Sequence, residues 1–173
     1  MPDFLSYPVP VIGFAAYSGS GKTTLLRGVI QVLVDRGLRI GIIKHSHHDF
    51  EIDQPGKDSY ELHHAGSSQT LLTSPYRSAL IRENPVAREP QLADALARLD
   101  PEALDLVLVE GFRDDPSLRK IEVHRPSLGR DPLYPLKPGI IAVASDAALD
   151  DCPLPVLPLD NPGVIADFIQ QSS

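Results

Sequence analysis

The amino-acid sequence predicts an α/β fold with a doubly wound, mostly parallel sheet and a β-hairpin extension. Two observations predict it. Several short segments are nearly free of charge and rich in Val, Ile and Leu, which is typical of strands buried on both faces of a parallel sheet. Between them lie segments whose apolar residues recur at helical spacing. Because 173 residues suit one domain of ordinary size, we expect a single domain over residues 1–173.

The composition narrows the class of protein. Hydrophobic residues make up 42% of the chain and charged residues 23%, which excludes a disordered or collagen-like chain. We expect no membrane span and no secretory signal, because no apolar run is long enough. The net charge of −7 argues against nucleic acid and membrane as partners. The single Cys152 excludes an internal disulfide and fits a cytoplasmic protein.

The first part of the chain predicts a strand, a helix and a second strand. Residues 9–17 are almost wholly apolar and predict the first strand. Residues 22–36 carry Leu, Val and Ile at helical spacing and end before Gly37, a residue type that commonly follows a helix C-terminus. Residues 38–44 predict the second strand. Together they form the βαβ unit of a parallel sheet.

The rest of the chain is interrupted by prolines and predicts shorter elements. The expected elements are helices over 58–65 and 92–99 and strands over 69–73, 79–82, 104–109, 120–124 and 139–144. A Ser-Pro-Tyr-Arg turn at 74–77 makes a hairpin of the two strands that flank it. Asn161 and Pro162 predict the start of a final helix. Its inner face would carry Val164, Ile165, Phe168 and Ile169.

A glycine-rich segment between the first strand and helix is the strongest motif. Residues 16–24 read A-Y-S-G-S-G-K-T-T and match the Walker A or P-loop pattern, with Ala16 in place of the first glycine. The glycines let backbone N–H groups turn toward an anion, and the helix adds its positive end. Lys22 would reach the β- and γ-phosphates, and Thr23 would ligate Mg²⁺. The expected nucleotide-binding residues are Gly19, Ser20, Gly21, Lys22, Thr23 and Thr24.

Two carboxylates follow other apolar runs. Glu110 comes directly after residues 104–109, where an acidic residue of a P-loop protein assists the metal ion. Its alternative interpretation is a solvated carboxylate at a strand end. Asp146 ends the segment Val-Ala-Ser-Asp, where GTP-binding P-loop proteins carry Asn-Lys-x-Asp, and only the Asp matches. Guanine is favoured over adenine, and the alternative for Asp146 is a simple turn-forming residue.

A polar segment follows the second strand. Residues 44–49 read K-H-S-H-H-D, and residues 53–59 read D-Q-P-G-K-D-S. Histidine and aspartate are common metal ligands, so a metal site is one interpretation. The other is a polar loop that meets the γ-phosphate, Mg²⁺ or a second anionic substrate, with Lys44 neutralising phosphate charge. We expect His63 and His64 on the next helix to be exposed and without a functional role.

These segments together resemble the MobB family of bacterial molybdopterin-guanine dinucleotide biosynthesis proteins. The matching segments are YSGSGKTTLL, IIKHSHHDFEIDQPGKDSYELHHAG, LDLVLVEGF and IIAVASD, in that order and spacing. The resemblance covers residues 11–146 and extends more loosely to the C-terminal helix. It implies a P-loop NTPase type of fold.

The resemblance also implies a function. It implies a homodimeric GTP-binding protein with weak, Mg²⁺-dependent GTPase activity, an adapter for MobA, the guanylyltransferase that transfers GMP from GTP onto molybdopterin. Lys22 and Glu110 would then serve catalysis, and Asp146 would bind guanine. The metal ligands would be Thr23, Glu110 and Asp49. Lys44 and His45 would face the nucleotide. A contact between the polar segment and the pterin phosphate is our own hypothesis and is not implied by the resemblance.

A different class of function remains open at the level of sequence. A P-loop small-molecule kinase or nucleotidyl transferase would use residues 44–59 to bind a phosphorylated acceptor. Such an enzyme usually supplies an arginine-bearing lid. The segment 113–130 does contain arginines at 113, 119, 125 and 130, but prolines and acidic residues interrupt it. A purely structural role is disfavoured by the intact Lys22–Thr23 pair.

Overall fold

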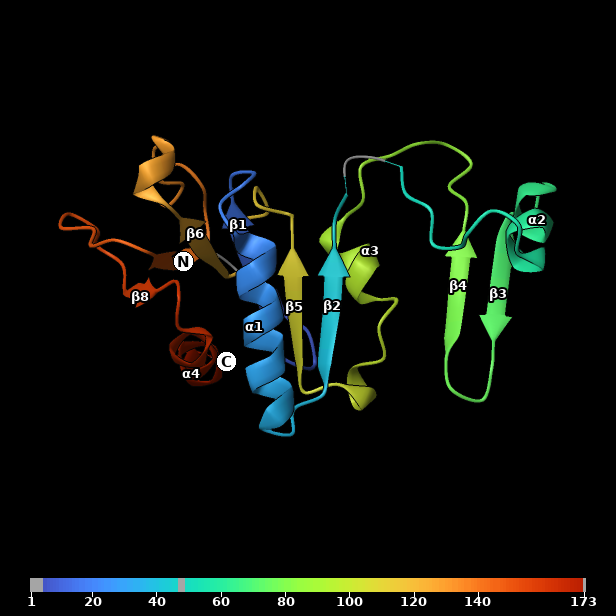
Figure 1. Cartoon of the computed structure of the whole chain (residues 1–173), viewed down its shortest axis with the longest axis horizontal. Helices are drawn as coiled ribbons and strands as arrows, with labels where there is room; N and C mark the ends of the chain where they lie inside the picture. Colours follow the sequence, from blue (N-terminus) through green and yellow to red (C-terminus); the bar gives the residue numbers. More distant parts are fainter. Residues whose placement is uncertain (1–4, 47–48, 173) are drawn as a thin grey trace. The chain divides into compact units, whose positions relative to one another are not determined.

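Six parallel strands form the sheet of the larger of two units into which the chain divides (Figure 1). This computed structural model describes residues 5–46 and 49–172. The larger unit comprises the residues up to His45 and those from Gln91 onward, and the smaller unit is Ser46–Pro90. In order across the sheet, the strands are β2 (Ile40–Lys44), β5 (Leu106–Glu110), β1 (Val11–Ala16), β6 (Lys120–His124), β7 (Ile140–Ser145) and β8 (Val156–Pro158). Every neighbouring pair is parallel.

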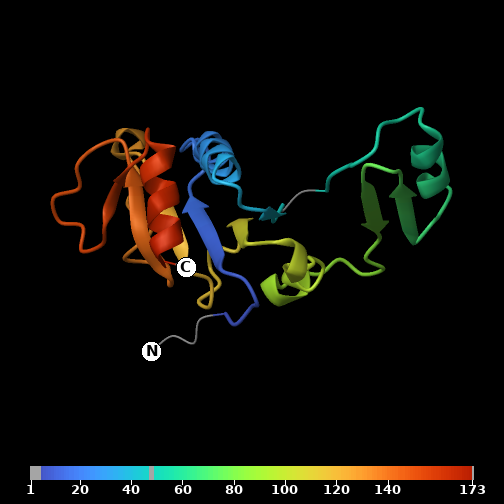
Figure 2. The same cartoon turned by 90° about the horizontal axis from the view of Figure 1, so that it is seen from below.

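Helices cover both faces of this sheet, so the predicted doubly wound α/β class is confirmed. The helices of the larger unit are α1 (Lys22–Asp35), α3 (Leu92–Leu96) and α4 (Pro162–Ser172), with 3₁₀ turns at Pro101–Ala103 and Pro126–Leu128. On β5, Leu106 and Leu108 belong to the core beneath α1 and α4, whereas Val107 and Val109 belong to the core beneath α3 (Figure 2). Burial on both faces explains why β5 is apolar at every position but its last.

The predicted inner face of the final helix is confirmed at Ile165, Phe168 and Ile169, which pack in the core, and is wrong at Val164. Its fully buried residues are Ile165, Ala166 and Ile169, whereas Val164 is 36% exposed. The first turn of α4 approaches α1 closely at Gly28. A Cβ atom added at Gly28 would lie only 2.7 Å from the Pro162 ring. A small residue such as Ala166 suits this close approach. The predicted start of the helix is confirmed, and the Val164 N–H donates to Asn161 Oδ1 at 3.3 Å.

Strand β8 was missed because it has only three residues and ends on a proline. A short strand with proline is confined to the edge of a sheet, where no second neighbour needs its N–H group. Periodicity cannot reveal an element of this length. In the described part of the chain, no helix is long and apolar enough to cross a membrane.

The smaller unit contains one helix and the predicted hairpin. It comprises α2 (Asp58–His64), β3 (Gln69–Thr73) and β4 (Ser78–Arg82). The two strands are antiparallel, and the Ser74 N–H donates to the Arg77 carbonyl across the turn at 2.9 Å. None of the described residues between 46 and 90 is buried. The paired residues Leu71 and Leu80 are 63% and 53% exposed, so this unit leaves apolar surface uncovered.

An ion pair joins the amino ends of β2 and β5. Asp105 accepts hydrogen bonds from Arg39 Nε at 3.0 Å, from Nη2 at 2.8 Å and from the Arg39 backbone N–H at 2.8 Å. The guanidinium also donates to the Glu102 carbonyl at 3.0 Å. The side-chain bond from Arg39 is the main cause that lowers the pKa of Asp105 to about 2.

This pair predicts a pH dependence of stability. The folded-state pKa of Asp105 lies below its unfolded value of 3.8, so its contribution to stability is present above that value and is lost as the pH falls toward about 2. The substitution Asp105→Asn removes this titration. We expect urea unfolding to show a smaller loss of stability between about pH 6 and about pH 3 in the variant than in the wild type. The matched substitution of the exposed Asp151 keeps the wild-type profile, and coincident profiles for Asp105→Asn would contradict the assignment.

Candidate functional site

The phosphate loop lies between β1 and α1, at the carboxyl edge of the sheet. Gly19 and Gly21 adopt φ values of 81° and 87°, which residues with a side chain rarely adopt. Gly21 is the N-cap of α1, so the loop leads directly to the positive end of that helix. Ser20, between the two glycines, is only 2% exposed. Two left-handed glycines at the start of a helix are the backbone feature that the predicted anion-binding nest requires.

Glu110 faces this loop from the end of β5. It pairs in register with Phe14 of β1 and with Lys44 at the end of β2. Its carboxylate lies 3.2 Å from Lys22 Nζ and 3.9 Å from Lys44 Nζ. The Glu110 side chain is 16% exposed, so it is not a freely solvated carboxylate. The structure thus brings together three predicted site residues, and two ammonium groups surround one carboxylate.

The turn after Glu110 is held against His45. The His45 N–H donates to the Glu110 carbonyl at 2.8 Å, and its ring stacks on Phe112 with centroids 4.7 Å apart. Gly111 has a φ of 108°, and a side chain there would place its Cβ 2.6 Å from the Cβ of His45. Phe112 also has a positive φ, at 49°. The turn that positions Glu110 therefore depends on a glycine and on the residue that follows β2.

Asp146 lies at the end of β7, where its partner is an arginine that the sequence analysis did not assign to the site. Arg125 Nη1 donates to Asp146 Oδ2 at 2.5 Å, and Arg125 Nε donates to the Ser20 carbonyl at 2.8 Å. Beside Asp146 lies a cavity of about 390 Å³ between the ends of β7 and β8. It is lined by Ser145, Asp146, Ala147, Ala148, Val156, Leu157, Pro158 and Asp160. The sequence related Arg125 only to the possible arginine-bearing lid of a kinase, although it directly follows a strand, as Asp146 does.

Three ionisable residues on β6 are buried, which sequence reasoning also missed. Lys120, Glu122 and His124 are at most 6% exposed. The Glu122 carboxylate accepts from the N–H groups of Leu133 and Tyr134 at 2.7 and 2.9 Å. Burial raises the pKa of Glu122, and these two donors oppose the shift. The carboxylate anchors the loop before β7 to the sheet, a structural role that positions β7.

The predicted polar segment belongs to the smaller unit from Ser46 onward, and His47 and His48 lie outside the described residues. Asp49 accepts from the Phe50 N–H at 3.0 Å. Asp53 accepts from Gln54 N–H and from the Ser59 hydroxyl, and the Ser59 bond is the main cause that lowers the pKa of Asp53. These bonds fix the P-G-K-D-S segment at the start of α2.

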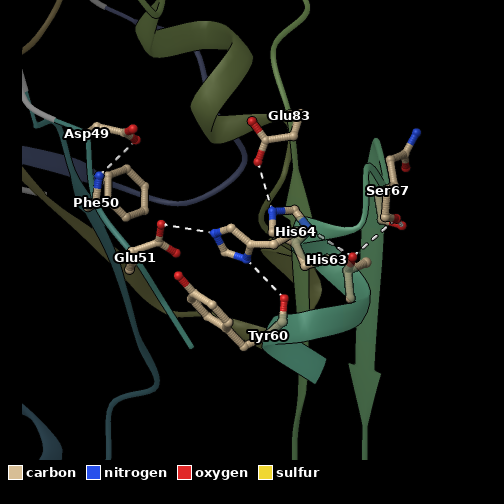
Figure 3. Close-up of polar contacts among 10 residues, drawn as sticks. Asp49, Phe50, Glu51, Tyr60, His63, His64, Ser67 and Glu83 are labelled. Carbon is tan, nitrogen blue, oxygen red and sulfur yellow. Dashed lines mark hydrogen bonds and ion pairs between the residues drawn. The ribbon is translucent and has the colours of Figure 1, made fainter. Parts of the chain in front are cut away.

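The two histidines of α2 have different environments (Figure 3). His63 was expected to be exposed, but its side chain is only 10% exposed and lies 2.9 Å from both Thr70 Oγ1 and Glu83 Oε1. It thereby connects α2 to both sides of the hairpin. His64 stacks on Tyr60 and contacts Glu51, and the Tyr60 carbonyl is the main cause that raises its pKa.

Metal ligation was the alternative for this segment. Within residues 5–46 and 49–172, no three side chains of His, Cys, Asp or Glu are grouped so that they could hold a metal ion. Thr23 and Glu110 supply oxygen donors, which are the ligands that Mg²⁺ prefers. The residues of the phosphate loop and β5 therefore fit Mg²⁺ by their chemistry.

Comparison with known proteins supplies the family. Residues 11–146 match the family model described as "MobB: Molybdopterin guanine dinucleotide synthesis protein B". The chain is 44% identical over 162 residues to the molybdopterin-guanine dinucleotide biosynthesis adapter protein of Escherichia coli, covering 93% of this chain and 91% of the relative. The protein of the same name from Haemophilus influenzae is 40% identical over 168 residues, covering 96% and 91%.

Solved structures agree with this assignment. A crystal structure of molybdopterin-guanine biosynthesis protein B is similar with a TM-score of 0.72 at 25% identity, over 94% of this chain and 99% of that one. The MobB homolog from Bacillus stearothermophilus is similar with a TM-score of 0.69 at 25% identity, over 94% and 96%. The resemblance read from the sequence motifs is thereby confirmed: the chain belongs to the family of molybdopterin guanine dinucleotide synthesis protein B.

Proposed function

We propose that this protein is a GTP-binding adapter of molybdopterin guanine dinucleotide biosynthesis with weak, Mg²⁺-dependent GTPase activity. The observation that carries the proposal is the arrangement of Lys22 and Glu110, 3.2 Å apart, at a loop with two left-handed glycines before α1. The names of the Escherichia coli and Haemophilus influenzae relatives support the adapter role. Its partner would be MobA, the guanylyltransferase that uses GTP and molybdopterin.

The charges of the site favour a triphosphate. The chain has a net charge of −7, yet Lys22, Lys44 and the amino end of α1 gather at one edge of the sheet. Lys22 would neutralise the β- and γ-phosphates, while the loop N–H groups orient them. Thr23 and Glu110 would hold Mg²⁺, which supplies charge neutralisation at the phosphates. Positioning and neutralisation alone imply slow hydrolysis.

The base would bind in the cavity beside Asp146. A carboxylate accepts from the two N–H groups that guanine presents and adenine does not. Asp146 Oδ1 makes no hydrogen bond within the described residues, so it is available to such donors. The cavity volume of about 390 Å³ accommodates a purine ring.

This assignment predicts the effect of Asp146→Asn. The amide keeps the size of the side chain but replaces one acceptor by a donor and removes the charge. We expect the preference for GTP over ATP to fall by about tenfold or more, because a hydrogen bond to a charged group contributes about 1.5–3 kcal/mol. Isothermal titration calorimetry with both nucleotides measures the ratio. The matched Asp151→Asn variant keeps the wild-type ratio, and the same ratio in Asp146→Asn would place base recognition elsewhere.

The smaller unit supports a homodimer as part of the proposal. None of its described residues is buried, and an isolated two-stranded hairpin is marginally stable in water. A second copy of the chain would cover the apolar pair Leu71 and Leu80. Molybdopterin is a further proposed ligand, with residues 49–59 as the candidate segment for its phosphate. We place the activity in the cytoplasm, which the single Cys152 fits.

The adapter role is tested by co-purification with MobA in the presence and absence of GTP and molybdopterin. An adapter retains MobA and hydrolyses GTP slowly whichever small molecule is added. A kinase or nucleotidyl transferase instead consumes nucleotide in proportion to the acceptor. The adapter proposal would be contradicted if the protein failed to retain MobA both with and without GTP and consumed one nucleotide for each acceptor molecule added.

A further inference from the structure

Arg125 connects two parts of the proposed nucleotide site that the chain brings together from distant positions. It directly follows β6 and precedes Pro126, which restricts its backbone to the extended region that it adopts, with φ −124° and ψ 104°. The Leu128 N–H donates to the Arg125 carbonyl at 3.0 Å. The backbone from which this side chain extends is therefore fixed on both sides.

The guanidinium contacts the phosphate loop through the Ser20 carbonyl. Its Nε lies 2.8 Å from that oxygen, and a side chain at Gly21 would come within 3.3 Å of Nη2. The Ser20 hydroxyl is buried and makes no hydrogen bond in the described part of the chain. The peptide between Ser20 and Gly21 leads into Gly21, which has a φ of 87° and is the left-handed N-cap of α1.

The orientation of this peptide matters for anion binding. In a planar trans peptide the carbonyl and the following N–H point in opposite directions. When Arg125 holds the Ser20 carbonyl, it also fixes the direction of the Gly21 N–H, one of the donors that an anion nest needs. Arg125 is itself held by Asp146, because its Nη1 donates to Asp146 Oδ2. The chain of contacts runs from the proposed base pocket to the phosphate loop.

We propose that Arg125 is a positioning residue that couples Asp146 to the phosphate loop. Through it, the carboxylate that faces the purine cavity also sets the affinity of the loop for phosphates. This inference rests on the proposed function and goes beyond it, because it gives Asp146 an effect on ligands that have no base. The link is intramolecular and needs no nucleotide to form.

The test uses inorganic tripolyphosphate, which carries the charge of GTP without its base. We expect Arg125→Ala and Asp146→Ala each to weaken tripolyphosphate binding by about tenfold in calorimetry. The variant that carries both substitutions is expected to bind tripolyphosphate with the affinity of whichever single variant binds it less tightly. The two effects do not add, because each substitution removes the same link. Arg125→Lys keeps the charge without the fork of donors and should give an intermediate affinity. It also serves as the second variant should Arg125→Ala fail to fold.

Controls separate this effect from general damage. Arg36 and Asp167 form a similarly exposed ion pair between the end of α1 and α4, with Nη2 and Oδ1 2.7 Å apart. Alanine at either position should leave tripolyphosphate affinity unchanged. The coupling is overturned when Asp146→Ala binds tripolyphosphate like the wild type, or when the two single effects add in the double variant. A wild-type protein that binds neither tripolyphosphate nor GTP instead overturns the proposed function itself.

Discussion

Lys22→Ala is expected to weaken GTP binding by about 100-fold or more. A lysine ammonium that contacts two phosphates contributes charge-assisted hydrogen bonds of about 1.5–3 kcal/mol each. Its removal also takes away the ammonium group that lies 3.2 Å from Glu110, so less positive charge offsets this carboxylate beside the phosphates. Loss of attraction and gain of repulsion therefore act in the same direction. Calorimetric titration with GTP in the presence of Mg²⁺ measures the change.

Two further variants make this prediction specific. Lys137 forms an ion pair with Asp114 at 2.5 Å, in the loop that leads to the amino end of β7, so Lys137→Ala removes a lysine away from the phosphate loop. Its affinity for GTP should equal that of the wild type. In Mg²⁺-free buffer, Glu110→Gln added to Lys22→Ala should recover part of the lost affinity, because it removes the repulsive charge. Unchanged GTP affinity in Lys22→Ala would show that the loop does not hold the phosphates.

Local patterns in the sequence predicted the elements that local physics determines. The apolar runs of β1 and β5 identified strands buried on both faces, and the helical spacing from Lys22 identified α1. The turn residues at 74–77 identified the hairpin within one residue of its observed bounds. In each case the signal lies within a few consecutive residues, and tertiary contacts reinforce it.

The interactions that were missed depend on residues far apart in the chain. Arg125 and Ser20 are separated by 105 positions, and no spacing rule relates them. The strand over 120–124 was predicted, but the burial of its charged residues was not, because only the folded loop supplies the amides that satisfy Glu122. His63 was judged exposed from its helix alone, whereas its partners lie on the hairpin. The sequence therefore predicts which site residues lie at the end of a given strand. It does not predict which of these residues contact one another across different strands.

Gly111→Ala is expected to reduce both stability and nucleotide affinity. At a φ of 108°, a residue with a side chain is strained by about 1–3 kcal/mol. The added Cβ would also lie 2.6 Å from the Cβ of His45, close to the backbone that donates to the Glu110 carbonyl. The contact cannot be relieved by rotating a flexible side chain, so the turn or the end of β2 must shift. Overpacking of this kind costs about 1–3 kcal/mol more.

Gly37→Ala provides the matched control, because Gly37 has a φ of 87° and no atom near its missing side chain. It carries the backbone strain without the clash, and it lies at the far end of α1 from the phosphate loop. We expect chemical unfolding to show a loss of about 1 kcal/mol for Gly37→Ala and about 3 kcal/mol or more for Gly111→Ala. Only Gly111→Ala should also weaken GTP binding, since its shift moves Glu110 and Lys44 relative to Lys22. Equal losses of stability in the two variants, with GTP affinity intact in both, would mean that the Gly111 turn adapts without disturbing the site.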